Sequence, residues 1–168
     1  MKIKTLRLTI NLSWIIIPNS MLISRVINLT ETNFMTDKLA FFDSNILVYL
    51  IEENLPKRKQ VALLLKPHFI ISTQVVAENI NVCIRKFKLS KEEALDHVKG
   101  FIPKLILVAV QPSTLEIAFM IFTKYQLSWW DSLIVASALE NNCEILYSED
   151  MQDGLVIESK LTIINPFK

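Results

Sequence analysis

From residue 38 onward, short runs of consecutive apolar residues alternate with longer segments of helical periodicity. The short runs contain almost no polar positions, which is typical of strands that are buried on both faces of a parallel sheet. The pattern predicts strands over residues 39–42, 69–71, 105–110, 144–147 and 162–164.

The longer segments repeat their apolar positions with the spacing of an α-helix. Ser90 followed by Glu93 forms a capping box, and Pro112 suits the first turn of a helix. Alternating strands and helices predict an α/β fold, here a three-layer α/β/α sandwich around a mostly parallel sheet of four to five strands. Helices are expected over 44–53, 56–66, 73–87, 91–104, 113–125 and 129–141.

The first 35 residues differ from the rest of the chain. They carry four basic residues and one acidic residue, with a moderately apolar stretch over 8–27 that resembles a weak signal sequence or membrane anchor. Polar residues and Pro18 interrupt this stretch, and no small-residue cleavage site follows it. We therefore expect residues 1–35 to be an atypical, poorly packed leader without chemistry, and residues 36–168 to form one domain that does not enter a membrane.

Composition excludes several classes of site. The two glycines, Gly100 and Gly154, cannot make a P-loop or a G-x-G-x-x-G dinucleotide motif. Two histidines and two scattered cysteines are too few for a structural zinc site or a disulfide framework, which favours a reducing compartment. A formal net charge of +1 argues against a broad basic face for nucleic acid. A bound metal would therefore need oxygen ligands, which favours magnesium, manganese or calcium.

Four acidic residues fall where such a site is expected in an α/β fold. Asp43 follows the first predicted strand, and Asp150 follows the fourth. Glu78 lies in the helix that leaves the second strand, and Asp131 begins the helix that leads into the fourth. Ligands of open α/β sheets bind beyond the carboxyl ends of the strands, so all four carboxylates can reach one edge of the sheet.

Each acid also has a purely structural explanation. Asp43 could be a helix N-cap, Asp131 a first-turn acid, and Asp150 and Asp153 turn residues. The apolar neighbours of Asp43, Glu78 and Asp131 argue against these explanations, because a buried, unpaired carboxylate costs several kcal/mol (~3 or more) or becomes protonated. No lysine or arginine adjoins these three acids in the sequence. A shared divalent cation is therefore favoured.

The order of four motifs resembles the PIN-domain nucleases, and is most similar to VapC-type toxins of prokaryotic toxin–antitoxin pairs. The resemblance covers about residues 39–167 and implies that Asp43, Glu78, Asp131 and Asp150 bind Mg²⁺ or Mn²⁺, with Asn45, Ser148 and Asp153 in support. Three acids near Ser148 depart from the usual last motif, which leaves open whether Glu149, Asp150 or Asp153 faces the metal. The motifs are Asp43-Ser44-Asn45, Gln74-Val75-Val76-Ala77-Glu78, Trp130-Asp131-Ser132-Leu133-Ile134-Val135 and Ser148-Glu149-Asp150.

The resemblance implies a metal-dependent endoribonuclease that leaves a 5′-phosphate and a 3′-hydroxyl. It further implies a small protein antitoxin, self-association as a homodimer and a cytoplasmic location. Two alternatives remain: a catalytically silent PIN-like domain that binds RNA or has a structural role, and an Asp43-nucleophile phosphatase. That phosphatase chemistry requires a second aspartate where this chain has Asn45.

Residues outside the acid motifs are candidates for substrate contact. One basic cluster comprises Arg85, Lys86 and Lys88, and a second spans 57–59; for both, a solvated helix face is the simpler interpretation. Trp129 and Trp130 could stack a base, although core packing is expected on so apolar a helix. His97 is expected at the surface.

Overall fold

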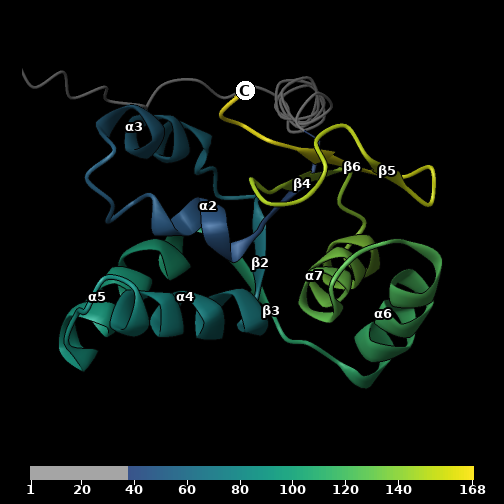
Figure 1. The fold of residues 1–168 in the computed structure, drawn as a ribbon, viewed down its shortest axis with the longest axis horizontal. Coiled ribbons are helices and arrows are strands. Elements are labelled where there is room, and N and C mark those ends of the chain that lie inside the picture. The colour runs from purple at the N-terminus through teal and green to yellow at the C-terminus, as the bar shows by residue number, and fades with distance from the viewer. Residues whose placement is uncertain (1–37) are drawn as a thin grey trace, which may run out of the picture. The chain divides into compact units, whose positions relative to one another are not determined.

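A six-stranded sheet forms the centre of the computed structural model, which describes residues 38–168 (Figure 1). The strand order is β3-β2-β1-β4-β6-β5, and all neighbouring pairs are parallel except β5 with β6. The leader predicted over residues 1–35 lies outside the described residues. The strands are β1 (Ala40–Phe42), β2 (Ile70–Ser72), β3 (Ile106–Val108), β4 (Ile145–Tyr147), β5 (Val156–Ile157) and β6 (Leu161–Ile164).

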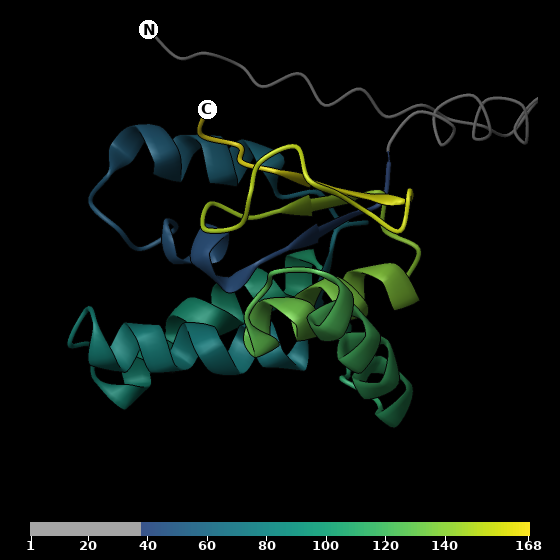
Figure 2. The same cartoon turned by 45° about the vertical axis from the view of Figure 1, so that its right-hand side comes forward.

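Helices cover both faces of this sheet. Figure 2 shows α3 on one side and α4 to α7 on the other, which confirms the predicted three-layer α/β/α sandwich. The helices are α2 (Ser44–Val48), α3 (Leu55–Leu64), α4 (Thr73–Arg85), α5 (Lys91–Phe101), α6 (Pro112–Lys124) and α7 (Trp129–Glu140), with a 3₁₀ turn η1 (Ile102–Lys104) after α5. None of the helices in residues 38–168 has the length and apolarity needed to cross a membrane.

The middle strands carry the hydrophobic core. Phe41 and Phe42 of β1 and Leu146 of β4 are fully buried, and they pack in one cluster with Ile163 of β6. β1 lies between β2 and β4, with Phe41 paired to Ile70 on one side and Leu146 on the other. The unbroken apolar pattern of β1 therefore follows from its central position, where both faces are covered.

Several boundaries differ from the sequence prediction. Burial on both faces is wrong for β3, because this strand lies at the sheet edge and leaves Ile106 and Leu107 each 43% exposed. The helix predicted over 44–53 ends at Val48, since Leu50 and Ile51 form i→i−3 backbone hydrogen bonds that tighten its last turn. β5 was not predicted, because a two-residue strand has no detectable periodicity.

Local signals for helix ends are confirmed. The Ser90 hydroxyl accepts from the Glu93 amide at 3.1 Å, and the Glu93 carboxylate accepts from the Ser90 amide at 2.8 Å. Pro112 is the first residue of α6. These contacts satisfy backbone amides that a helix start otherwise leaves unpaired, so they help to fix where α5 and α6 begin.

Candidate active site at the carboxyl edge of the sheet

Asp43 directly follows β1 and lies where the carboxyl ends of β1 and β4 are adjacent. The Asp43 amide donates to the Tyr147 carbonyl at 3.0 Å, which extends the β1–β4 ladder by one residue and places Asp43 beside Ser148. Asp43 precedes α2 in extended conformation, but its side chain makes no capping hydrogen bond. The N-cap explanation of this carboxylate is therefore wrong.

The Asp43 carboxylate is buried, with 4% of the residue exposed. It accepts hydrogen bonds from Ser148 Oγ at 2.8 Å, Asn45 Nδ2 at 2.9 Å and Ser44 Oγ at 3.3 Å. All three donors are neutral. The carboxylate is thus held in one orientation without a compensating positive charge.

The environment of Asp43 raises its pKa from 3.8 to about 7. Burial is the largest cause, the Ser148 hydrogen bond acts in the opposite direction, and repulsion from Glu78 and Asp131 raises the pKa further. Glu78 and Asp131 therefore each lie within electrostatic reach of Asp43. Among residues 38–168, no lysine or arginine forms an ion pair with any of the three.

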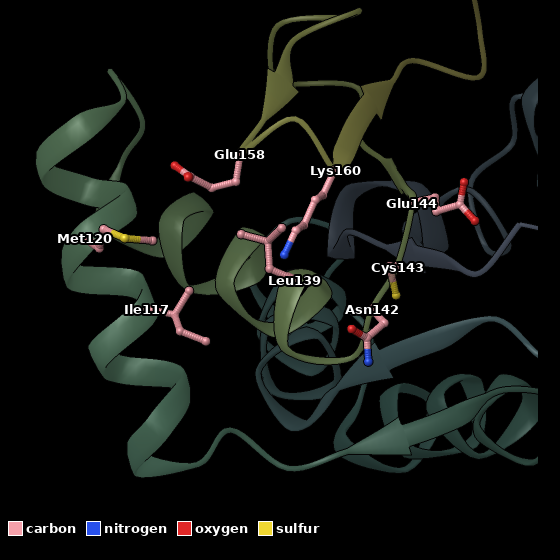
Figure 3. Close-up of a pocket in the computed structure, with 8 residues that line it drawn as sticks. All are labelled: Ile117, Met120, Leu139, Asn142, Cys143, Glu144, Glu158 and Lys160. Atoms are coloured by element: carbon pink, nitrogen blue, oxygen red, sulfur yellow. The ribbon is translucent and has the colours of Figure 1, made fainter.

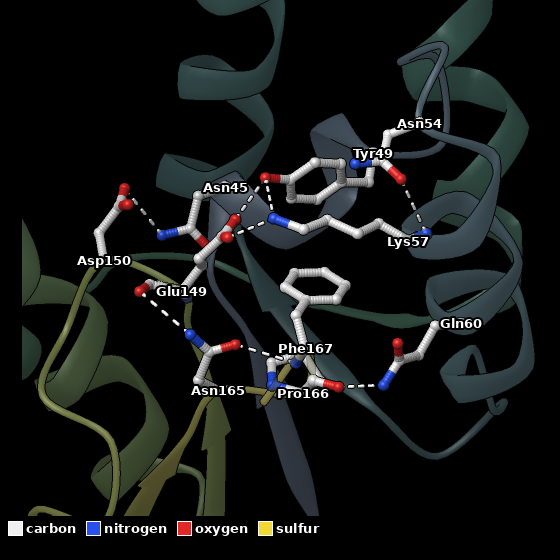
Figure 4. Close-up of polar contacts among 10 residues, drawn as sticks. All are labelled: Asn45, Tyr49, Asn54, Lys57, Gln60, Glu149, Asp150, Asn165, Pro166 and Phe167. Atoms are coloured by element: carbon white, nitrogen blue, oxygen red, sulfur yellow. Dashed lines mark hydrogen bonds and ion pairs between the residues drawn. The ribbon is translucent and has the colours of Figure 1, made fainter.

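Asn45 connects Asp43 to the loop after β4. Its Nδ2 donates to Asp43, to Asp150 Oδ2 at 3.1 Å and to Ser148 Oγ at 3.3 Å, while its Oδ1 accepts from the Glu149 amide at 3.3 Å. The Asp150 and Asp43 carboxylates therefore both contact the same Asn45 amide nitrogen; Figure 4 shows the contact of Asp150 with Asn45.

The Glu149 carboxylate belongs to a separate cluster with Lys57 and Tyr49 (Figure 4). It forms an ion pair with Lys57 and accepts a hydrogen bond from Tyr49. Lys57 Nζ lies over the rings of Tyr49 and Phe167, 4.5 and 4.6 Å from their centroids. Burial raises the pKa of Glu149, but the hydrogen bonds from Lys57 and Tyr49 outweigh it and leave the pKa below its ordinary value.

The Asp153 carboxylate contacts the chain segment that follows β6. Its Oδ1 accepts from the Asn165 amide at 2.8 Å, and its Oδ2 lies 3.6 Å from Lys168 Nζ. It therefore fixes the chain after β6. Of the three acids near Ser148, Asp150 is the one that shares a hydrogen-bond donor with Asp43.

Glu78 and Asp131 come from the two helices that face this edge. Glu78 accepts from Gln74 Nε2 at 2.8 Å, and the same nitrogen donates to the Trp130 carbonyl at 3.1 Å, which ties α4 to the start of α7. Asp131 accepts from Ser128 Oγ at 2.8 Å, so it has the first-turn role that its position suggested. Gln74 was not recognised from sequence, although its position four residues before Glu78 places both on one helix face.

A second amide not recognised from sequence lies beneath the site. The buried Asn79 donates from Nδ2 to the Ser44 carbonyl at 3.0 Å, and its Oδ1 lies 3.2 Å from His97 Nε2. His97 is half-buried and packs against Phe101, and burial lowers its pKa. The prediction of a surface His97 is therefore wrong, and this pair supports the segment that follows Asp43.

The carboxylates of Asp43, Glu78, Asp131 and Asp150 are the candidate ligands for a divalent cation. Within residues 38–168, no three His, Cys, Asp or Glu side chains are close enough together to be a formed metal site. The available donors are nevertheless all oxygens, and Glu78 and Asp131 both repel Asp43, which has no basic partner among the described residues. Such a set fits a hard cation such as Mg²⁺ or Mn²⁺, which would remove the repulsion at Asp43.

The predicted basic contacts are outside this acid cluster. Arg85 ends α4 and Lys86 and Lys88 follow it, all three exposed, and Lys86 lies over the Phe87 ring. Lys57 of the second cluster is already paired with Glu149. Contact of these residues with a substrate stays a prediction.

A pocket of about 590 Å³ lies near the amino end of β4, at the opposite end of this strand from Ser148 (Figure 3). Its lining contains Glu144, Glu158 and Lys160, but none of the predicted site residues. The carboxylate edge and this pocket are therefore separate features.

Comparison with known proteins assigns the fold. The family model described as "PIN domain" matches residues 40–152, which contain Asp43, Glu78, Asp131 and Asp150. No curated protein is matched by the chain.

Solved structures from three bacteria share this architecture at low sequence identity. A toxin–antitoxin complex from Klebsiella pneumoniae is 21% identical, with a TM-score of 0.59 over 76% of this chain and 97% of that one. DNA-bound VapBC from Salmonella typhimurium is 17% identical, with a TM-score of 0.61 and the same coverage of both chains. A sarcin-ricin loop cleaving VapC toxin from Mycobacterium tuberculosis is 15% identical, with a TM-score of 0.56 over 66% of this chain and 89% of that one. With its family model matched from the first strand to the loop after β4, the chain belongs to the PIN domain family.

Proposed function

We propose that this protein is an Mg²⁺- or Mn²⁺-dependent endoribonuclease that hydrolyses RNA phosphodiester bonds. The carrying observation is the buried Asp43 carboxylate, whose pKa of about 7 reflects burial and the nearby charges of Glu78 and Asp131. A cluster of acids without basic partners is unfavourable on its own, and a bound divalent cation relieves it.

Asp43, Glu78, Asp131 and Asp150 would hold the cation. When bound, it would supply a nucleophile at neutral pH and offset the charge that develops on the leaving oxygen. Asn45 and Ser148 hold Asp43 and Asp150 in fixed orientations through the hydrogen bonds described above. Asp153 contributes indirectly, because it anchors the segment against which the Asp150 loop lies.

The substrate and partners follow from the resemblance to VapC toxins. Single-stranded or looped RNA is the expected substrate, cut to leave a 5′-phosphate and a 3′-hydroxyl. Two of the similar structures are toxin–antitoxin complexes by description, which supports a small antitoxin that covers the cleft. Exposed apolar side chains on α6, among them Phe119 and Phe122, support a homodimer. A cytoplasmic location is part of the same proposal.

The decisive experiment incubates the purified full-length protein with RNA in Mg²⁺, in Mn²⁺ and in EDTA, beside the Asp43→Asn variant. Cleavage should require the metal and Asp43, and sequencing of the fragment ends should give 5′-phosphates. Binding of RNA without cleavage under any metal condition would favour the silent-domain alternative. An acyl-phosphate trapped on Asp43 would favour the phosphatase.

A further inference from the structure

A cavity of about 720 Å³ adjoins the carboxylates between α4 and α7. Glu78 belongs both to this cavity and to the acid cluster. Pockets of 300–1,000 Å³ are typical of small-molecule sites, so this one has room for a nucleobase and part of its sugar. Its lining includes Gln74, Ala77, Glu78, Val110, Trp130 and Leu133.

Trp130 forms one wall of the cavity and is 61% exposed. Its neighbour Trp129 packs against Phe119 and Phe122, with ring centroids 5.4 and 6.0 Å away. Trp129 is also half-buried against a buried cluster that includes Leu133, so core packing is confirmed for Trp129 and wrong for Trp130. The Trp130 backbone is held by the hydrogen bond from Gln74, so an exposed indole is presented from a fixed position beside Glu78.

The polar groups of the cavity suit an uncharged ligand that donates hydrogen bonds. Gln74 is 9% exposed, and its Oε1 is buried without a hydrogen-bond partner among the described residues. Its amide nitrogen is already committed to Glu78 and to Trp130, so only the oxygen is left to accept. A buried acceptor that stays unpaired is unfavourable, and an exocyclic amine or ring N–H of a base would satisfy it.

Charge argues against a phosphate in this cavity. Among residues 38–168, its lining contains Glu78 and no lysine, arginine or histidine. A carboxylate beside a phosphate is repulsive, whereas a neutral base can stack on the indole and contact the apolar floor formed by Ala77, Val110 and Leu133.

We infer that this cavity is a nucleobase subsite, in which Trp130 stacks one unpaired base of the RNA next to the scissile phosphate and Gln74 Oε1 accepts a hydrogen bond from that base. This inference rests on the proposed nuclease function and deepens it, because it assigns substrate positioning to residues outside the acid cluster. The subsite selects single-stranded RNA, since a base within a duplex is already stacked on its neighbours and its pairing edge is engaged.

The test measures RNA binding in the full-length Asp43→Asn background, which prevents cleavage. A labelled single-stranded RNA is titrated by fluorescence anisotropy against this protein and against versions that also carry Trp130→Ala, Trp130→Phe or Leu63→Ala. Trp130→Ala should weaken binding by about 5- to 150-fold, the effect of removing one base–aromatic stack, and Trp130→Phe should recover most of it. Leu63 is 82% exposed on α3, so Leu63→Ala is a matched control for loss of exposed apolar area and should change nothing.

A second titration separates stacking from a general disturbance of the fold. A series of RNAs carries one abasic nucleotide at successive positions. At one position, the abasic nucleotide should weaken RNA binding to the protein with intact Trp130 by the same factor as Trp130→Ala does. At that position it should not weaken RNA binding to the Trp130→Ala protein any further. Equal affinity of Trp130→Ala and its parent would overturn the inference and leave the cavity to another occupant, such as a protein side chain. The inference would also be overturned if the loss of RNA affinity in Trp130→Ala and the loss caused by the abasic nucleotide were additive at every position of the RNA.

Cleavage by the protein with intact Asp43 is measured in parallel, so that the two proposals can fail separately. Metal-dependent cleavage together with no Trp130 effect would overturn the subsite alone. Absence of both cleavage and RNA binding would overturn the nuclease and the subsite together.

Discussion

Replacing Asp43 by Asn should make the metal-free protein more stable at neutral pH. Asn retains the oxygen that accepts from Ser148 and Asn45, and its amide nitrogen would lie beside Ser44 Oγ, which can accept. The substitution therefore preserves the shape of Asp43 and its hydrogen bonds from Ser148 and Asn45 while removing a buried charge.

The size of the effect follows from the pKa of Asp43. The pKa rises from 3.8 to about 7 on folding, and each pH unit corresponds to 1.36 kcal/mol, so ionised Asp43 lowers the free energy of unfolding by about 4 kcal/mol. The unfolded chain loses this proton near pH 4 and the folded protein only near pH 7. The cost is therefore absent below pH 4, grows as the pH rises through this window, and is complete above pH 7.

The assay is urea denaturation in EDTA at pH 4 and at pH 8, followed by circular dichroism. Asp43→Asn should be more stable than the parent at pH 8, by up to about 4 kcal/mol, and nearly equal to it at pH 4. Added Mg²⁺ should stabilise the parent, by about 2.7 kcal/mol at a hundred times its Kd, and should have little effect on the variant. A variant that is no more stable than the parent at pH 8 would refute the argument that this carboxylate is buried without compensation.

Four further substitutions test the surroundings of Asp43 and the core of the sheet. Asn45→Ala removes the donor shared by Asp43 and Asp150, and should reduce metal affinity or RNA cleavage by about 10- to 100-fold while far-UV circular dichroism stays unchanged; parental metal affinity and cleavage would contradict this role. Glu149→Gln should change cleavage little and should change the free energy of unfolding by about 1 kcal/mol or less, because its partly exposed ion pair is separate from the acid cluster. Asp150→Asn, in contrast, should abolish cleavage. Equal losses of cleavage in the two variants would place Glu149 at the metal. Leu146→Ala should lower the free energy of unfolding by about 2–5 kcal/mol in urea titrations, since Leu146 is fully buried in the central β4, and a loss below 1 kcal/mol would contradict its place in the core.

Sequence pattern predicts the centre of this fold better than its edges. β1 and β2 are buried on both faces, and their apolar runs identify them directly. β3 has the same kind of run but pairs on one side only, and its exposure depends on the strand order, which local pattern does not contain. β5 depends on pairing with β6 and has no signal of its own.

The candidate site shows a similar division. Position after a parallel strand was enough to group Asp43 with Asp150, because the carboxyl ends of β1 and β4 are adjacent. Sequence does not give side-chain directions, and these pair Glu149 with Lys57 and Asp153 with the Asn165 amide. Gln74 acts through partners on two helices, and one of these is a backbone carbonyl that sequence cannot indicate.

The sheet order has a consequence for synthesis on the ribosome. β1 emerges early, yet its neighbour β4 lies about a hundred residues later, and the hydrogen bond between Asp43 and Ser148 spans a separation of 105 residues. Chains emerge from the amino terminus, so the nascent polypeptide carries Asp43 in water, with an ordinary acidity, until nearly all of the domain has been translated. The acid cluster therefore cannot close before β4 has been translated, and a prematurely terminated chain that lacks β4 cannot assemble it.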